Sequence, residues 1–248
     1  MKELSVLIPV FNDLEVLSEL LKRLSPVLES ITSNYEIVFV DDGSKDDSVQ
    51  VLKELQDQDY RIKIVILANN FGQSNAIAAG LENSSGDVIV VMDSDLEDRP
   101  EDIPVLLNAI EENDVQMAIA QRKIRKDSLW KKFSSKIFFK FCAKVTDIEH
   151  PDDLGVFRVF KRNVYNKILQ DKNLHGTILS RFYRAKIPYV TVNLIKDQRY
   201  AGKSGYTFFR RCTLALDRLL PHLRNTGLRQ NRDPYFVIKE IIEIRETR

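Results

Sequence analysis

Four acidic side chains follow directly after one apolar run of this 248-residue chain. The run is Val88–Met92, and the acidic residues after it are Asp93, Asp95, Glu97 and Asp98. Two carboxylates at ~4 Å repel each other by about 1 kcal/mol in water, and by about 4 kcal/mol at an effective dielectric constant near 20. A bound Mg²⁺ or Mn²⁺ ion relieves this repulsion, because both ions prefer oxygen ligands. For an Asp-x-Asp pair alone, a solvated acidic turn is an open alternative.

A second acidic cluster follows another run that is mostly apolar. Tyr35–Val40 leads into Asp41, Asp42, Gly43 and Ser44. If both runs are parallel strands, their carboxyl ends meet at one edge of a sheet, where open α/β sheets bind ligands. The two clusters together therefore predict a crevice for a nucleotide and a metal ion. The sequence has no G-x-x-x-x-G-K-[ST] and no G-x-G-x-x-G after a strand, which disfavours P-loop NTPases and ordinary dehydrogenases.

The first half of the chain alternates strand and helix patterns. Apolar runs predict strands over residues 4–11, 35–40, 62–68, 87–93 and 115–121. Helical spacing of apolar residues predicts helices over residues 14–28, 48–56, 74–84 and 103–113. Strands of nearly continuous apolar character between helices indicate an α/β fold with a mostly parallel sheet and helices on both faces.

Beyond residue 120 the pattern becomes basic. Residues 122–145 have a helical period, and residues 128–144 combine lysines with an aromatic face, as in a helix that lies on a membrane surface. An ordinary core helix with solvated lysines is the open alternative. Residues 154–170 predict a strand and a helix, and residues 187–195 another strand. A glycine-containing loop then leads into a helix, and the final helix is expected within residues 233–246.

Charge divides the chain more sharply than its net value of +1 indicates. Residues 1–115 hold 8 of the 37 Lys and Arg residues and 24 of the 36 Asp and Glu residues. This division either keeps two attracting halves together or separates a cation-binding half from an anion-binding half. No apolar run approaches the roughly 18–20 residues that span a bilayer. Cys142 and Cys212 are expected to be free thiols in a reducing cytosol.

Several motifs, in this order and spacing, resemble the family 2 glycosyltransferases of GT-A fold, and most closely the polyprenyl-phosphate or dolichyl-phosphate sugar transferases. The motifs occupy residues 6–13, 38–48, 69–80, 90–102, 153–164 and 199–206. The resemblance covers roughly residues 4–220. It implies a Rossmann-like, mostly parallel sheet with a small C-terminal acceptor region.

The resemblance also implies roles on the donor side. Residues that would line the nucleobase pocket are Pro9, Phe11 and Asp13, and Asp41 would accept a hydrogen bond from the base. Asp93 would hold nucleotide and metal, and the cation bound to the diphosphate would be reached by Asp95, the expected catalytic residue, and Glu97. The family often has Tyr at the position of Phe11, Arg at that of Asn69 and Gln at that of Glu97. Asp98, Glu101 and Asp102 are expected to be surface or helix-capping residues.

On the acceptor side, a lipid phosphate requires cations. The positions that match the family's phosphate-contacting region and its "GKS" loop are Arg122, Arg125, Lys136, Arg199, Lys203 and Ser204. Asp153 is the candidate base if the acceptor is instead a sugar hydroxyl. A phosphate acceptor is already an anion and needs no strong base.

These patterns predict one catalytic domain over residues 1–220, with a nucleotide-sugar and metal half (1–115) and an acceptor half (116–220). Residues 221–248 would form a basic tail with a terminal helix. The expected activity is inverting transfer from a nucleotide-sugar, with Mg²⁺ or Mn²⁺, to a polyprenyl-phosphate-type lipid in envelope glycan synthesis. A glycan acceptor is the alternative enzyme, and a nucleotide-sugar-binding scaffold is the non-enzymatic one. The expected location is the cytoplasm, peripherally on the membrane, with no nucleic-acid partner.

Overall fold

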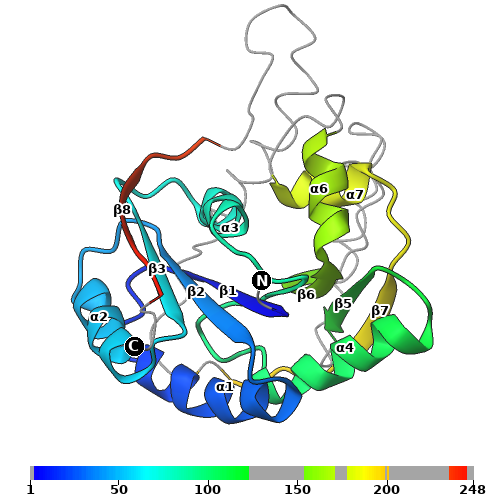
Figure 1. Cartoon of the computed structure of the whole chain (residues 1–248), viewed down its shortest axis with the longest axis horizontal. Coiled ribbons are helices and arrows are strands. Elements are labelled where there is room, and N and C mark those ends of the chain that lie inside the picture. Colours follow the sequence, from blue (N-terminus) through cyan, green and yellow to red (C-terminus); the bar gives the residue numbers. More distant parts are fainter. Residues whose placement is uncertain (1–2, 123–153, 171–177, 199, 201–234, 245–248) are drawn as a thin grey trace, which may run out of the picture.

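A computed structural model describes residues 3–122, 154–170, 178–198, 200 and 235–244 (Figure 1). These residues form one eight-stranded sheet in the order β7-β5-β6-β4-β1-β2-β3-β8. The strands are β1 (Leu4–Val10), β2 (Tyr35–Asp41), β3 (Ile62–Leu67), β4 (Val88–Val91), β5 (Met117–Arg122), β6 (Leu154–Lys161), β7 (Val190–Leu194) and β8 (Ile238–Ile242). The helices are α1 (Leu17–Ile31), α2 (Ser48–Gln58), α3 (Gln73–Glu82), the 3-10 helix η1 (Pro100–Asp102), α4 (Ile103–Glu112), α6 (Arg162–Gln170) and α7 (Ile178–Arg184).

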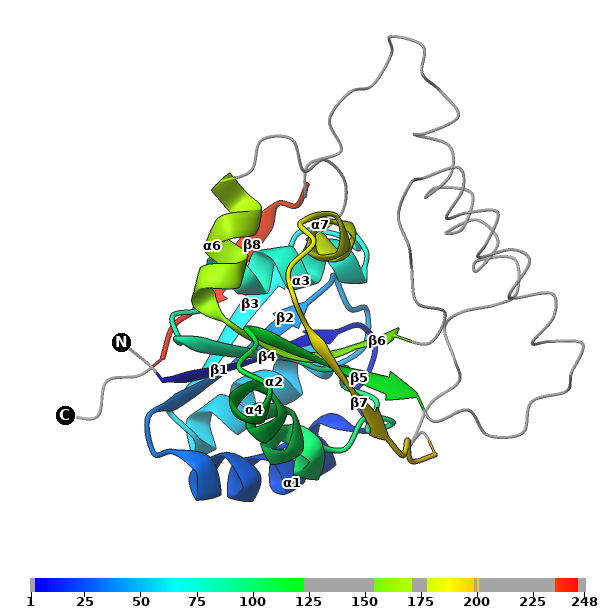
Figure 2. The ribbon, with the colours of Figure 1, turned by 90° about the vertical axis from the view of Figure 1, so that its right-hand side faces the viewer.

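The centre of the sheet is parallel and buried on both faces. β1 pairs in parallel with β2 on one side and with β4 on the other, and β2 pairs in parallel with β3. Helices α1, α2 and α4 cover one face, and α3, α6 and α7 cover the other (Figure 2). Successive residues of a strand point to opposite faces, so Val6 and Ile8 join the core under α1, whereas Leu7 packs with Ile77 of α3. The predicted α/β fold with helices on both faces is therefore confirmed.

The remaining strands make the sheet mixed. β6 lies antiparallel between β4 and β5, and β7 extends the sheet in parallel with β5. The predicted strands and helix over residues 154–170 and 187–195 are confirmed in type, whereas α7 was not predicted. Among the described residues, no helix is both long and apolar enough to cross a membrane.

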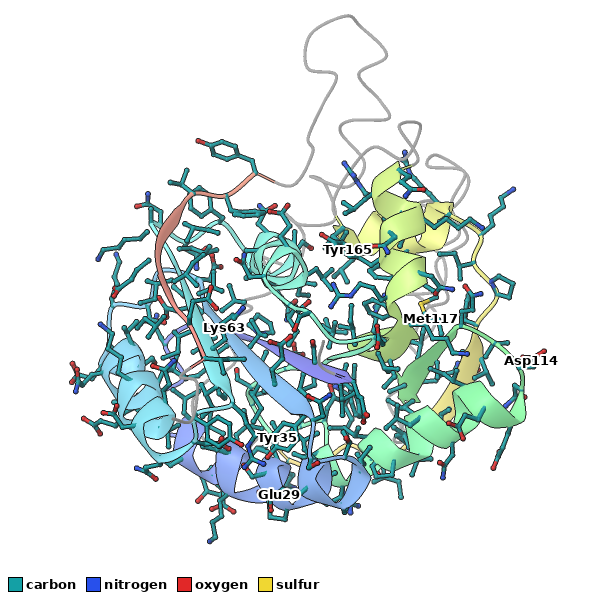
Figure 3. The ribbon with its side chains drawn as sticks, in the orientation of Figure 1. Glu29, Tyr35, Lys63, Asp114, Met117 and Tyr165 are labelled. Atoms are coloured by element: carbon teal, nitrogen blue, oxygen red, sulfur yellow. The ribbon has the colours of Figure 1, made fainter. Side chains whose placement is uncertain are left out.

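The expected helix within residues 233–246 is wrong where the structure describes it, because Ile238–Ile242 form strand β8. β8 pairs antiparallel with β3, whose outer edge would otherwise present unpaired backbone groups. The side chains of two residues, Gln56 and Lys63, also hold it there. The side-chain amide of Gln56 donates to the carbonyls of Ile242 and Glu243 over 3.2 and 3.0 Å. Lys63 of β3, labelled in Figure 3, forms an ion pair with Glu243 at 2.9 Å. Tertiary pairing therefore overrides the helical spacing of the isoleucines.

A buried polar network ties the amino ends of the central strands together. One carboxylate oxygen of Glu36 accepts hydrogen bonds from the hydroxyl groups of Ser5 and Ser85, at 2.6 and 2.9 Å, and from the backbone N–H of Ser85 at 2.6 Å. Arg162, at the start of α6, donates to the carbonyl of Gly86 at 2.9 Å and to Ser84 Oγ at 3.0 Å. This network lies at the amino edge of the sheet, opposite the edge where β1, β2 and β4 end.

Candidate active site

Residues 93–98, which include the Asp-x-Asp sequence, form a tight turn directly after β4, and we call it the acidic turn. Met92 is fully buried, whereas Asp93 and Asp95 are partly accessible to solvent. Leu96 adopts a left-handed backbone with a φ of 59°, and its side chain is only 1% exposed, so core packing holds a conformation that non-glycine residues rarely adopt. The backbone N–H of Glu97 donates to Asp95 Oδ1 at 3.0 Å. The turn therefore fixes the two aspartates at the carboxyl edge of the sheet.

The residue between the two aspartates binds the loop after β1. Ser94 Oγ donates to Asp13 Oδ2 over 2.6 Å, and the backbone N–H of Phe11 donates to the same oxygen at 3.3 Å. The backbone N–H of Asp13 donates to Ser48 Oγ, at the start of α2, over 3.1 Å. Pro9 lies inside β1, whereas Phe11 and Asp13 lie in the loop after it. The structure thus brings Asp13 and the Asp-x-Asp turn into contact.

Asp93 has a partner from another element. Gln73, the first residue of α3, donates from Nε2 to Asp93 Oδ1 over 2.6 Å. The contact joins the start of α3 to the end of β4. The first turn of this helix therefore lies next to the acidic turn.

A third segment, which follows the edge strand β7, also contacts the acidic turn. It comprises residues 195–198 and 200; we call it the post-β7 segment. Lys196 Nζ lies 2.8 Å from Asp98 Oδ1. The backbone N–H of Asp197 donates to the carbonyl of Glu97 at 3.0 Å, and that of Tyr200 to the carbonyl of Asp95 at 3.4 Å.

The expectation that Asp98 is a surface residue is wrong. Asp98 is only 4% exposed, and Lys196 supplies its counter-charge. Burial raises the pKa of Asp98, and the cation of Lys196 opposes that rise. Asp98 Oδ2 is buried and has no hydrogen-bond partner among the described residues. The acidic turn therefore contains a buried residue in an ion pair, Asp98, in addition to its partly accessible aspartates.

Electrostatics single out Asp93. Loss of hydration raises the pKa of Asp93 to about 7, and the neighbouring carboxylates of Asp95 and Asp98 add to the rise. Lys196 acts in the opposite direction. A carboxyl group poised near neutral pH among other carboxylates is a site that favours a cation.

The second acidic cluster fixes the neighbouring loops. Asp41 accepts the backbone N–H of Ser44 on both oxygens, at 3.3 and 3.2 Å, and burial raises its pKa. Asp42 accepts the backbone N–H groups of Phe71 and Gly72 at 2.7 and 2.9 Å. Asp41 thus caps its own turn, and Asp42 holds the β3–α3 loop (residues 68–72). The contact of Asp41 with a nucleobase stays a prediction.

The acidic turn suits a hard divalent cation that also binds a diphosphate. Among the described residues, no three Asp, Glu, His or Cys side chains are grouped so that they alone could hold a metal ion. Mg²⁺ commonly uses only one or two carboxylates and takes its remaining ligands from substrate phosphates and water. The oxygen donors of Asp93 and Asp95 fit this mode, and the place of Glu97 as a third ligand stays a prediction.

Most predicted acceptor residues lie outside the described residues: Arg125, Lys136, Asp153, Arg199, Lys203 and Ser204. The basic stretch 128–144 does as well. The backbone of Arg122 ends β5 and pairs in register with Leu194 of β7. This register places Arg122 beside the strand that leads into the post-β7 segment.

The sequence interpretation missed Ser94 within the acidic turn, as well as Gln73 and Lys196, which contact it. Ser94 stands between the two aspartates, and its hydroxyl was a visible signal, since a serine in a buried turn needs a partner. Gln73 stands at the start of an expected helix. Lys196 gives no local signal at all, because its contact with Asp98 exists only once β7 is in the sheet.

A mostly parallel sheet with an Asp-x-Asp turn at its carboxyl edge is typical of the GT-A glycosyltransferases. The chain belongs to glycosyl transferase family 2, whose model matches residues 5–169.

Two relatives and one solved structure illustrate the match. An uncharacterized glycosyltransferase, YkcC of Bacillus subtilis, is 33% identical over 220 residues, which are 86% of this chain and 66% of that protein. Undecaprenyl-phosphate 4-deoxy-4-formamido-L-arabinose transferase of Salmonella choleraesuis is 34% identical over 232 residues, which are 92% of this chain and 69% of that protein. The chain thus spans about two thirds of the length of these relatives.

The solved structure is the mannosyltransferase PcManGT from Pyrobaculum calidifontis, in complex with GDP-Man and Mn²⁺. It is 16% identical, and the match has a TM-score of 0.60 over 91% of this chain and 65% of that chain. At this identity the likeness concerns the fold alone.

Proposed function

We propose that this protein is an inverting glycosyltransferase that transfers a sugar from a nucleotide-sugar donor to a polyprenyl-phosphate-type lipid. One observation carries the donor side of this proposal. The accessible aspartates Asp93 and Asp95 lie at the carboxyl edge of the sheet, beside Asp13 and the start of α3. The lipid acceptor is supported by the 34% identity to an undecaprenyl-phosphate sugar transferase.

The chain's own residues would bind and orient the donor. The loops that carry Phe11, Asp13 and Asp41 would enclose the nucleobase, and the aspartates of the acidic turn would face the diphosphate. Asp93 and Asp95 would hold a divalent cation that, when bound, neutralises charge on the leaving diphosphate.

The reaction itself is a displacement at the anomeric carbon. An oxygen of the acceptor phosphate attacks the face opposite the diphosphate, the new C–O bond forms, and the nucleoside diphosphate leaves with the electron pair. Because the acceptor oxygen is already anionic, no general base is required. Arg122, Arg125, Lys136 and Arg199 would bind the acceptor phosphate, and the basic stretch 128–144 would contact the membrane surface.

The test is release of nucleotide by the purified chain from a panel of nucleotide-sugars, with Mn²⁺ or Mg²⁺, and with or without polyprenyl phosphate. We expect release from one donor to require both the metal and the lipid. Asp95→Ala should reduce transfer at least about a hundredfold. Turnover near that of the wild type in this variant would contradict the donor site.

The acceptor is tested separately. Arg122→Ala and Arg199→Ala should weaken lipid binding more than nucleotide binding, and equal loss of both would contradict a lipid-phosphate acceptor. Transfer to a soluble glycan that is lost in Asp153→Asn would identify a sugar hydroxyl as the acceptor. No detectable nucleotide release from any donor would favour a scaffold.

A further inference from the structure

The start of α3 is attached to the acidic turn by one side chain. Gln73 Nε2 donates to Asp93 Oδ1 over 2.6 Å, a short hydrogen bond for a nitrogen donor. Both side chains are only partly accessible. Asp93 lies among other carboxylates, which disfavour its charged form. A hydrogen-bond donor stabilises that charged form and leaves room for a cation. Gln73 is such a donor, since its amide carries no charge.

The loop that precedes Gln73 is fixed by contacts with residues that follow β2. This β3–α3 loop is anchored by Asp42, which accepts the backbone N–H groups of Phe71 and Gly72. Gly43 packs against the same loop so closely that a Cβ there would lie 2.6 Å from the carbonyl carbon of Asn69. The loop therefore has little freedom to move relative to β2.

The C-terminal segment holds the same loop from outside. The backbone N–H of Ala68 donates to the carbonyl of Val237 at 2.8 Å, and that of Tyr235 to Asn75 Oδ1 at 3.2 Å. Asn75 Nδ2 in turn donates to the carbonyl of Phe71 at 2.8 Å. The rings of Tyr235 and Phe71 meet edge to face, with centroids 5.7 Å apart. Residues far apart in the sequence thus fix the position from which Gln73 reaches Asp93.

We propose that Gln73 is a positioning residue for the metal and diphosphate site: its amide holds one oxygen of Asp93 and leaves the other oriented for a cation. This inference rests on the proposed function. Hydrogen-bond partners of metal ligands orient the ligand, and their loss typically weakens metal binding about 10–100-fold. Gln73 needs no contact with substrate to act in this way.

The direct test is Mn²⁺ binding to the full chain, measured by calorimetry and by the electron paramagnetic resonance signal of free Mn²⁺, with UDP and with GDP as probes. Gln73→Met keeps the length and helix preference of the side chain but removes the amide. Gln73→Asn keeps the amide but is one methylene shorter. We expect both variants to raise the Kd for Mn²⁺ at least about tenfold.

A matched control is Gln50→Met. Gln50 also donates from its amide to a carboxylate, Glu54 Oε1 at 2.9 Å, but this contact is exposed and lies within α2. Its Kd for Mn²⁺ should stay within about twofold of the wild type. Tm values near that of the wild type in all three variants would show that the fold is retained.

Kinetics separate positioning from general damage. In Gln73→Met the Mn²⁺ concentration for half-maximal activity should rise about tenfold, and most of kcat should return at saturating Mn²⁺. A loss of kcat that Mn²⁺ does not restore would overturn the positioning role.

The binding outcomes distinguish the two proposals. If the wild type binds Mn²⁺ and nucleotide and Gln73→Met binds them equally well or more tightly, only the positioning role is overturned. If the wild type binds neither, the proposed function falls and the role of Gln73 falls with it.

Discussion

Lys196 and Asp98 form an ion pair of 2.8 Å beneath the accessible aspartates of the acidic turn. The pair joins the post-β7 segment to the turn after β4, and two backbone hydrogen bonds from Asp197 and Tyr200 accompany it. In the sequence, the predicted acceptor residues Arg199, Lys203 and Ser204 lie within or directly after this segment, so we expect this junction to link the donor and acceptor parts of the proposed site.

Removal of one partner of this buried pair should be costly. Lys196→Met leaves the Asp98 carboxylate buried and uncompensated, and we expect the free energy of unfolding to fall by about 3 kcal/mol. Urea denaturation at neutral pH measures this. The control is Lys22→Met, whose ion pair with Glu19 involves a lysine side chain that is 78% exposed; its stability should change by less than about 0.5 kcal/mol. Equal effects of the two variants would contradict a structural role for Lys196.

The raised pKa of Asp93 predicts a pH dependence of stability in the absence of metal. Between the ordinary aspartate pKa of 3.8 and the folded value of about 7, the folded chain binds more protons at this residue than the unfolded chain does. The contribution of Asp93 to stability is therefore present below about pH 4 and is lost as the pH rises to about 7. The full loss is at most about 4 kcal/mol.

Asp93→Asn tests this dependence, because an amide does not titrate and is not penalised at high pH. In EDTA, the variant should gain stability relative to the wild type at pH 8 but not at pH 4. Parallel stability curves for the two proteins between these pH values would show that Asp93 titrates normally.

The hydrogen bond from Ser94 to Asp13 should stabilise the site. Ser94→Ala removes a donor to a carboxylate at 2.6 Å, and we expect a loss of about 1.5–3 kcal/mol in the free energy of unfolding. Nucleotide affinity should fall as well, because the loop after β1 loses its link to the acidic turn. Ser30→Ala is the control, since the Ser30 hydroxyl donates to the carbonyl of Val27 within the exposed surface of α1. Unchanged stability and affinity in Ser94→Ala would contradict this role.

Two glycines with positive φ separate steric crowding from backbone strain. Gly43→Ala places a Cβ 2.6 Å from a backbone atom of Asn69, at a φ of +71°. Gly72→Ala meets nothing within 4 Å but has a φ of +90°, so it incurs strain of about 1–3 kcal/mol alone. Thermal unfolding should therefore show the larger loss for Gly43→Ala. The opposite order would mean that the β3–α3 loop can move to accommodate a Cβ at residue 43 with little loss of stability.

The sequence predicted the parallel centre of the sheet well because its signals are local. The runs that became β1, β2 and β4 are mostly apolar, with Ser5 and Glu36 as exceptions, and the acidic residues at the ends of β2 and β4 mark where those strands end. The same reasoning located Asp93 and Asp95, since strand order alone brings their turn to the carboxyl edge.

Long-range contacts were not predictable in the same way. The isoleucines of β8 have a spacing that suits a helix, and only the unpaired edge of β3 makes them a strand. Asp98 reads as one more surface acid until β7 brings Lys196 to it. The contact of Gln73 with Asp93 could not be predicted without knowing where α3 begins relative to β4. Helix spacing in the sequence gives the start of a helix only approximately.

The polar network around Glu36 lies at the amino edge of the sheet, away from the described loops that follow β1, β2 and β4. These contacts hold the strands together at the end opposite the Asp-x-Asp turn. Substitutions in the described loops at the carboxyl edge would leave the contacts of Ser5, Glu36 and Arg162 in place. For engineering of donor choice, the chain therefore offers an anchoring network that substitutions at the Asp-x-Asp turn would not touch.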